Sequence, residues 1–455
     1  MNVKEVAAAA RQADVKLIRF EYCDVSGVAR TKAIHVSQLE RKLTEGVSLT
    51  RAQMAINLLE QLIHVDGMEP VGEIRLVPDP ATFTVLPWVP ASASVLCDQL
   101  GHDRVDWGAC PRSYLKSIVE RASRLGLRVQ AAFENEYYLA REDPGSATGF
   151  APYDAPGHAP VYSSIGHDFT AALMVETTDA LEAQGLIVEQ AINEYGAGQQ
   201  EISIRHADAL TAADNQMKFR DTVRGVALKN GLLASFAPKP FPDQAGNGAH
   251  IHFSLWAADG EQNVFHDARG RYGLSDTGFA FIGGVLAHLP ALVALTAPTV
   301  NSYRRLQPRF WSSAYTAWGP DNREGAIRVP SQRRGIEMES TNLELKPSDP
   351  SSNPYLSLGA LLAAGLDGIQ NKRDPGEPTL VDPDTLSDDE RRRRGIRRLP
   401  TSLGEALDAL ERDDVLRAAL GETLAKEYLT VKRSEVRGFD GKDVAFEIEQ
   451  HFYKF

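Results

Sequence analysis

"AAFENEYYLA", residues 131–140, has the two-residue period of a β-strand and carries charged side chains on one face. In a strand, residues i and i+2 point to the same side and lie roughly 7 Å apart, so Glu134 and Glu136 share a face. A Glu-x-Glu pair by itself is also typical of the wet face of an ordinary sheet. Its meaning therefore depends on whether other strands carry ionisable groups at the same spacing.

Three other segments do carry them. They are "GAGQQEISIRH" (196–206) with Glu201, and Glu194 seven residues before it; "GNGAHIHFSLW" (246–256) with His250 and His252; and "TNLELKPSD" (341–349) with Glu344 and Lys346. A structural histidine pair or a surface ion pair would explain any one of these segments alone. Together they predict one shared polar face. Because burying several carboxylates without counter-charge is too costly to persist, that face implies bound cations.

The chemistry of this set favours a hard divalent cation. Five carboxylates and one imidazole suit Mg²⁺ or Mn²⁺ better than a thiolate-bound metal. The candidate ligands are Glu134, Glu136, Glu194, Glu201, His250 and Glu344. Four arginines, Arg305, Arg309, Arg323 and Arg328, stand close together in a chain whose net charge is −12. Metal ions beside arginines indicate a nucleotide, since both neutralise phosphate oxygens. A P-loop is excluded, because no G-x-x-x-x-G-K-[ST] stretch occurs.

Composition limits the class of protein. With 455 residues, 43% of them hydrophobic, the chain can bury a large core in two domains or one large elaborated domain. Its 61 acidic against 49 basic residues argue against a nucleic acid or an anionic membrane as partner. The basic run 391–398 directly follows "SDDE" and predicts a self-compensating surface segment. Three scattered cysteines fit a reducing compartment. The N-terminus lacks a signal peptide, and His288 and Pro290 interrupt the most apolar stretch, so we expect a soluble cytoplasmic protein.

The pattern along the chain predicts two domains, residues 1–105 and 106–455. The first contains a short helix and strands, with a hairpin signal in residues 15–36 around a Ser-Gly turn. From residue 127 onward helices alternate with strands near 127–140, 200–206, 232–237, 249–256, 325–329 and 341–346. A helix capped by Asn353, with Pro354 at its first position, is apolar nearly all round and is expected to be buried. The predicted fold class is α+β, with an antiparallel sheet carrying the site.

Six segments, in order along nearly the whole chain, resemble the glutamine synthetase superfamily of ATP-dependent carboxylate–amine ligases. They are "FENEYYL", "NEYGAGQQE", "KPFPDQAGNGAHIHFSL", "NSYRRLQP", "WGPDNREGAIRVP" and "LELKPSDPSSNPYL". The resemblance implies an N-terminal β-grasp domain and a catalytic domain built on a curved antiparallel sheet with surrounding helices. It also implies ATP as co-substrate and two to three Mg²⁺ or Mn²⁺ ions per site. The expected assembly is a homo-oligomer of stacked rings, a dodecamer, with active sites between neighbouring subunits.

The resemblance also implies a role for each matched residue. Glu136, Glu194 and Glu201 resemble ligands of a metal nearer the acyl substrate, and Glu134, His250 and Glu344 those of a metal nearer the nucleotide phosphates. The residues that resemble ATP-binding groups are His206, His252, Arg323 and Arg328, and Arg323 also counts as catalytic. Those that resemble glutamate-binding groups are Arg305, also catalytic, Gly246, and Lys346 in place of a family arginine. In this chemistry ATP phosphorylates the γ-carboxylate of glutamate, and an amine then displaces phosphate.

Two positions depart from the enzymes of this family that use ammonium. Trp311 stands where they carry an acidic flap residue, and no Asp or Glu occurs from 306 to 320. Thr50 stands at the best-aligned position of an aspartate that also serves ammonium, with Glu45 nearby. Ammonium needs anionic groups that bind the cation and help to remove its proton, whereas Trp311 offers apolar and π surface to an amine substrate.

These departures predict a ligase that joins glutamate to an organic primary amine, an alkyl- or arylamine. It would act through γ-glutamyl phosphate, release ADP and phosphate, and serve amine catabolism. The alternatives are an ordinary glutamine synthetase that uses ammonium, and a non-catalytic sensor or scaffold. Trp311 could also simply pack the flap or a subunit interface.

Overall fold

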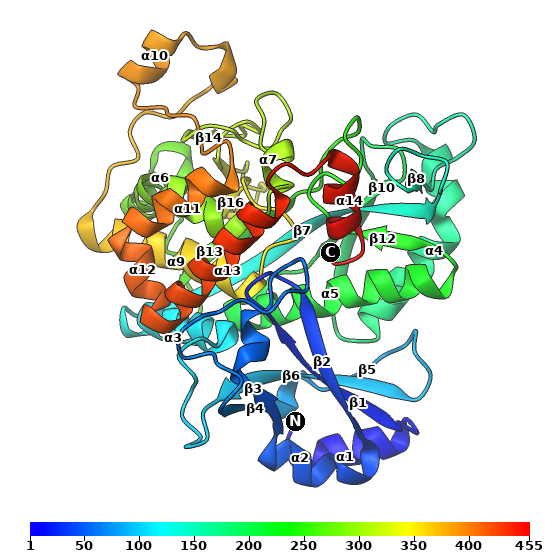
Figure 1. The fold of residues 1–455 in the computed structure, drawn as a ribbon. Helices are drawn as coiled ribbons and strands as arrows, with labels where there is room; N and C mark the ends of the chain where they lie inside the picture. The colour runs from blue at the N-terminus through cyan, green and yellow to red at the C-terminus, as the bar shows by residue number, and fades with distance from the viewer.

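The computed structural model describes all 455 residues and contains two β-sheets (Figure 1). The first sheet has the strand order β2-β1-β6-β4-β3, with β5 paired to β6. Its strands are β1 (Leu17–Cys23), β2 (Ala29–His35), β3 (Val47–Thr50), β4 (Glu73–Pro78), β5 (Thr84–Val85) and β6 (Ser92–Leu100). Helices α1 (Val3–Gln12) and α2 (Leu39–Glu45) lie below this sheet in Figure 1. The predicted hairpin is confirmed, since β1 and β2 pair antiparallel.

The second sheet carries the charged strands. Its order is β14-β15-β16-β13-β7-β10-β9, and β8, β11 and β12 also pair with β7. The strands are β7 (Leu127–Glu142), β8 (Phe150–Pro152), β9 (Val188–Asn193), β10 (Gln199–Ile204), β11 (Ala207–Asp208), β12 (Leu233–Ser235), β13 (Ala249–Ala257), β14 (Trp318–Pro320), β15 (Ile327–Val329) and β16 (Leu343–Leu345). β7, with 16 residues, runs through the middle of the molecule in Figure 1. The stretch 131–140 is therefore the centre of the sheet.

One edge of this sheet differs from the expected antiparallel arrangement. β14 and β15 pair in parallel, with Trp318 opposite Ile327 and Pro320 opposite Val329, whereas the other pairings in the sheet are antiparallel. Each of these two strands has only 3 residues, too few for a periodic pattern to indicate direction. The sheet is therefore mixed, within the predicted α+β class.

Two apolar helices, α6 (Asp276–Thr296) and α9 (Pro354–Asn371), pack against each other in the main core. The Asn353 side chain caps α9 and Pro354 is its first residue, as predicted, and α9 is buried from Pro354 to Gly368. A Cβ on Gly368 would lie 2.1 Å from the carbonyl oxygen of Ala280, so only glycine permits this approach. By length and composition α6 could cross a membrane, but 72% of its apolar window is buried inside the protein, as in a core helix.

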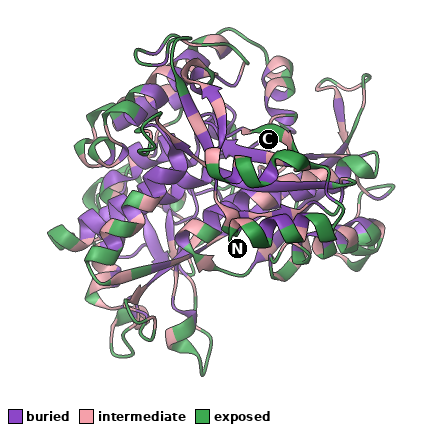
Figure 2. Ribbon diagram, turned by 90° about the horizontal axis from the view of Figure 1, so that it is seen from below, coloured by how far each residue is buried: buried purple, intermediate pink, exposed green.

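The other α-helices lie within residues 111–452, and the last five of them, α10 to α14, form the C-terminal part of the chain. They are α3 (Pro111–Arg124), α4 (Ser164–Glu182), α5 (Ala209–Lys229), α7 (Ser302–Arg305), α8 (Glu337–Ser340), α10 (Asp388–Arg393), α11 (Leu403–Arg412), α12 (Asp414–Leu420), α13 (Glu422–Phe439) and α14 (Val444–Phe452). Buried residues gather where these helices meet the sheet, and exposed ones on outer faces and loops (Figure 2). α10 projects at the top of Figure 1, and Arg391 pairs there with Asp388 and Arg394 with Glu390, which confirms the self-compensating segment.

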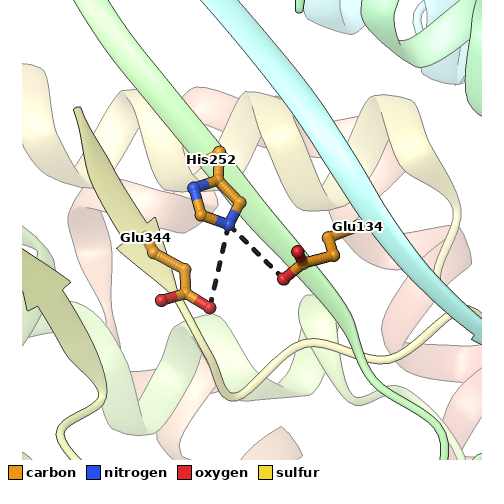
Figure 3. Close-up of side chains that lie close together, drawn as sticks. All are labelled: Glu134, His252 and Glu344. Atoms are coloured by element: carbon orange, nitrogen blue, oxygen red, sulfur yellow. Dashed lines mark ion pairs between the residues drawn. The ribbon is translucent and has the colours of Figure 1, made fainter. Parts of the chain in front are cut away.

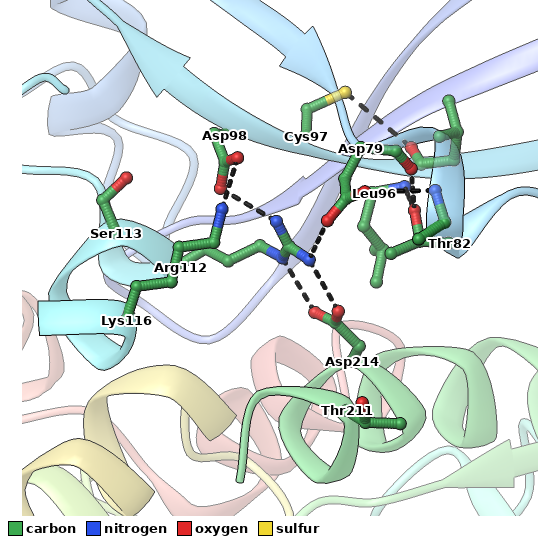
Figure 4. Close-up of polar contacts among 12 residues, drawn as sticks. Asp79, Thr82, Leu96, Cys97, Asp98, Arg112, Ser113, Lys116, Thr211 and Asp214 are labelled. Carbon is green, nitrogen blue, oxygen red and sulfur yellow. Dashed lines mark hydrogen bonds and ion pairs between the residues drawn. The ribbon is translucent and has the colours of Figure 1, made fainter. Parts of the chain in front are cut away.

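Arg112, near the start of α3, joins the first sheet to the helices of the second (Figure 4). Its guanidinium donates hydrogen bonds of 2.9 and 2.8 Å to Asp214 of α5, one of 2.9 Å to Asp98 of β6, and one of 2.8 Å to Asp79 after β4. With 3% of the side chain exposed, this is a buried cation shared by three carboxylates. The domain division at residue 105 falls between β6 and α3, and stays a prediction.

Candidate active site

The strand register brings the charged residues of four sequence segments onto one face of the second sheet. In a paired ladder, residues directly opposite each other point to the same side. The expected shared face is therefore confirmed, as one continuous row across β10, β7, β13, β16 and β15. The opposite pairs along it are Glu201–Glu136, Glu134–His250, His252–Glu344 and Glu344–Arg328.

Two carboxylates and two imidazoles converge at the centre of this row. Nε2 of His252 lies 3.6 Å from Oε2 of Glu134 and 3.8 Å from Oε1 of Glu344 (Figure 3). Nδ1 of His250 lies 3.4 Å from Oε2 of Glu134 and 3.3 Å from Oε1 of Glu344. Ligand atoms of Glu134, His252 and Glu344 all lie within 4.8 Å of one another. Either histidine can therefore join the two carboxylates around an ion, whereas the sequence indicated His250 alone.

This donor set fits a hard divalent cation. Nε2 of His252 and both carboxylate oxygens of Glu344 are buried, and their contacts within the chain are ion pairs without hydrogen-bond geometry. Coordination of a cation would satisfy these atoms, and carboxylate oxygens with an imidazole nitrogen suit Mg²⁺ or Mn²⁺. Two positive side chains stand beside Glu344: Nε of Arg328 at 2.5 Å and Nζ of Lys346 at 3.5 Å. The cluster therefore places groups that could ligate a metal ion next to two cationic side chains.

The carboxylates at the two ends of the row differ in their electrostatics. Burial would raise the pKa of Glu344, but the charges of Lys346, His252 and His250 outweigh it and lower that pKa to about 2. At the other end, burial and then the neighbouring carboxylates raise the pKa of Glu201 to about 10. Burial likewise raises the pKa of Glu136 to about 7. Ionisation of Glu201 at neutral pH, and full ionisation of Glu136, are therefore favoured by added positive charge, which a divalent ion provides.

Arg305 lies beside the row with 4% of its surface exposed. Its Nη2 is 3.3 Å from Nε2 of His250, and its Nη1 donates to the carbonyl oxygen of Ser348 at 3.1 Å. The "GNG" turn packs directly on the Arg305 side chain. A Cβ on Gly246 would lie 2.8 Å from Cγ of Arg305, and one on Gly248 2.8 Å from Nη2. These positions need glycine because the backbone approaches a fixed arginine.

A pocket of about 210 Å³ opens next to Glu194. Its walls include Asp154, His158, Val161, Glu194, Tyr195 and Gln244. The hydroxyl of Tyr162 donates to Oε2 of Glu194 at 3.3 Å, and the Gln199 side chain donates to Oε2 of Glu136 at 3.2 Å. Neither Tyr162 nor Gln199 was expected from the sequence. Tyr162 belongs to a loop without periodicity, and the contact of Gln199 depends on strand register.

The flap, residues 306–313, carries Trp311 with 57% of its surface exposed, beside Phe310 with 55% exposed. The backbone N–H of Trp311 donates to Oε1 of Glu324 at 2.9 Å. The flap sequence itself contains no acid. The carboxylate of Glu324, 13 residues further along the chain, contacts the flap only because the fold brings the two segments together. The ring of Phe310 lies 5.0 Å from Nζ of Lys239, which donates to the carbonyl oxygen of Gln244 in the wall of the pocket beside Glu194.

Three predicted site residues lie apart from the row. Arg323 is exposed and makes no ion pair, although its charge partly offsets the effect of burial, which raises the pKa of Glu194. His206 is exposed just beyond β10. Thr50 ends β3 in the first sheet, where its backbone N–H donates to Gln53. Within one chain, Thr50 and His206 make no hydrogen bond or ion pair with the row.

Comparison with known protein families identifies the family to which this chain belongs. The family "Glutamine synthetase, catalytic domain" matches residues 108–451, and "Glutamine synthetase N-terminal domain" matches residues 1–111. The chain belongs to the glutamine synthetase superfamily. This confirms the predicted fold class, an N-terminal domain followed by a catalytic domain on a curved sheet, and the predicted class of enzyme, an ATP-dependent ligase. Glutamine synthetases use ATP and divalent metal ions, in agreement with the donor set of the row.

Individual relatives cover nearly the full length. A glutamine synthetase from Halobacterium salinarum is 37% identical over 446 residues, which cover 97% of this chain and 94% of that protein. The gamma-glutamylpolyamine synthetase GlnA3 from Streptomyces coelicolor is also 37% identical, over 431 residues covering 93% and 90%. Among solved structures, a GmaS/ADP complex aligns with a TM-score of 0.85 and 30% identity over 98% of both chains. The glutamine synthetase and the gamma-glutamylpolyamine synthetase are thus equally similar to this chain in sequence.

Proposed function

We propose that this glutamine synthetase-like enzyme forms a γ-glutamyl amide from glutamate and an organic primary amine. The observation that carries the proposal is the exposed indole of Trp311 in a flap whose own sequence has no acid. An aromatic face buries the apolar body of an alkyl- or arylamine, whereas ammonium has no apolar surface to bury there. A relative of 37% identity that is named as a gamma-glutamylpolyamine synthetase supports this substrate class.

In this proposal one end of the charged row binds a metal ion near the acyl substrate, and the other end binds a metal ion near the phosphates of ATP. Glu136, Glu194 and Glu201 would hold a metal on the acyl side. Glu134 and Glu344, with His250 or His252, would hold one on the phosphate side. The residues that would bind ATP are His206, His252, Arg323 and Arg328, and those that would bind glutamate are Arg305, Gly246 and Lys346. When bound, the metal ions supply positive charge that stabilises the transferring phosphoryl group.

The reaction has two steps. A γ-carboxylate oxygen of glutamate attacks the γ-phosphorus of ATP, the bond to ADP breaks, and γ-glutamyl phosphate forms. The amine nitrogen then attacks the acyl carbon, phosphate leaves, and the nitrogen loses a proton. The enzyme would be a cytoplasmic homo-oligomer of stacked rings, with each active site shared between neighbouring subunits. Thr50, which lies apart from the row within one chain, would then contribute to the site of a neighbouring subunit.

An amine panel tests the proposal. Glutamate-dependent phosphate release from ATP is measured with ammonium, alkylamines, arylamines and polyamines at saturating Mg²⁺. We expect at least one organic amine to give a higher kcat/KM than ammonium. A higher kcat/KM for ammonium than for every organic amine would indicate an ordinary glutamine synthetase. Absence of phosphate release with any amine would favour a sensor or scaffold.

A further inference from the structure

The flap has an unfavourable backbone conformation. Three of its residues, Arg309, Trp311 and Ser313, have φ values of 65°, 52° and 65°. Residues with a Cβ rarely adopt this left-handed region, and such conformations persist only where surrounding contacts hold them. Three of them within five positions mean that specific contacts maintain the shape of the flap.

Two of those contacts come from one short segment outside the flap, Glu324 and Gly325. Oε1 of Glu324 accepts the backbone N–H of Trp311 at 2.9 Å, and the carbonyl oxygen of Gly325 accepts the hydroxyl of Ser313 at 3.0 Å. The carboxylate thus holds the residue that carries the indole. A charged acceptor makes a stronger hydrogen bond than a neutral one, particularly when it is buried, and Glu324 is 9% exposed.

The segment of Glu324 also runs beside the charged row, because the backbone N–H of Lys346 donates to the carbonyl oxygen of Ala326 at 3.0 Å. Burial raises the pKa of Glu324, while the N–H of Trp311 and the charge of Lys346 act in the opposite direction.

We propose that Glu324 is a positioning residue for the amine: its carboxylate fixes the backbone of Trp311 and so sets where the indole meets the substrate. The inference rests on the proposed function and identifies what determines its amine specificity. Glu324 acts through Trp311, so its loss changes amine binding more than glutamate or ATP binding.

Hydrogen–deuterium exchange tests the contact itself, whatever amine the enzyme uses. The variants are Glu324→Ala, Glu324→Gln, which keeps the volume and an acceptor oxygen, and the control Asp321→Asn, whose carboxylate accepts the backbone N–H of Ser331 at 2.9 Å outside the flap. We expect exchange of the flap peptide to be about tenfold faster in Glu324→Ala, intermediate in Glu324→Gln and unchanged in the control. Equal flap exchange in all four proteins would overturn the proposal.

Kinetics test the consequence for specificity. In Glu324→Ala we expect KM for the preferred amine to rise about tenfold while KM for glutamate stays within about twofold, and Glu324→Gln to recover part of the loss. If the wild-type enzyme uses amines and Glu324→Ala leaves KM for the amine unchanged, the inference is wrong. If the wild-type enzyme prefers ammonium, the proposed function fails, and flap exchange still decides whether Glu324 holds Trp311.

Discussion

Replacing Trp311 with alanine removes the surface that distinguishes this flap. A tryptophan side chain presents up to about 250 Å², and Trp311 is 57% exposed, so about 140 Å² is available to a substrate. An amine body that covers about half of this surface buries about 70 Å², worth about 1.8 kcal/mol at about 25 cal/mol per Å². That free energy corresponds to a rise of about 20-fold in KM for the amine. Alanine keeps the Cβ, so the strain of the backbone at this position changes little.

The assay is the initial rate of phosphate release with varied amine at saturating glutamate and ATP. Phe310→Ala is the matched control, because Phe310 is 55% exposed in the same flap and its ring lies against Lys239. We expect Trp311→Ala to raise KM for the amine with kcat nearly unchanged, Trp311→Phe to retain most of the affinity, and Phe310→Ala to have the smaller effect. If Trp311→Ala changes KM for every amine by less than about twofold, the indole does not contact the amine and instead packs the flap or an interface.

Three further predictions concern the metal cluster, the core and pH. Glu344→Gln removes a carboxylate central to the cluster and should raise the Mg²⁺ concentration for half-maximal phosphate release by at least about tenfold, with weaker Mg²⁺ binding by calorimetry. Arg112→Met leaves three carboxylates without their buried cation and should lower the free energy of unfolding in urea by about 3–5 kcal/mol, whereas Arg124→Met, 71% exposed on the same helix, should cost less than about 1 kcal/mol. Burial acts to lower the pKa of His288, but its hydrogen bonds to Asp413 and Asp367 outweigh this and raise it above 6.5. Its stabilising effect is therefore complete below about pH 6.5 and lost as pH rises through the folded-state pKa, so His288→Asn should lower Tm more at pH 6 than at pH 8.5.

Local periodicity revealed most of the charged row in advance. Glu134 and Glu136 are two residues apart, as are His250 and His252. Because side chains in a strand alternate between its two faces, this spacing shows directly that each pair shares a face of the sheet. The cap of α9 was equally predictable, because an N-cap depends on residues within one turn of the helix. The direction of β14 could not be predicted, since a strand of 3 residues has no period.

The sequence by itself thus determined the chemistry of the site: which carboxylates, imidazoles and arginines exist, and which neighbours face the same way. Only the tertiary structure decided which of these side chains from distant segments come into contact. It brought both histidines to the same two carboxylates, joined three carboxylates around Arg112, and hydrogen-bonded Glu324 to the backbone of Trp311. The physical reason is that periodicity and capping are set by bonds within a few residues. Strand register and the shape of a strained flap are instead set by packing between distant segments, and no short stretch of sequence records that packing.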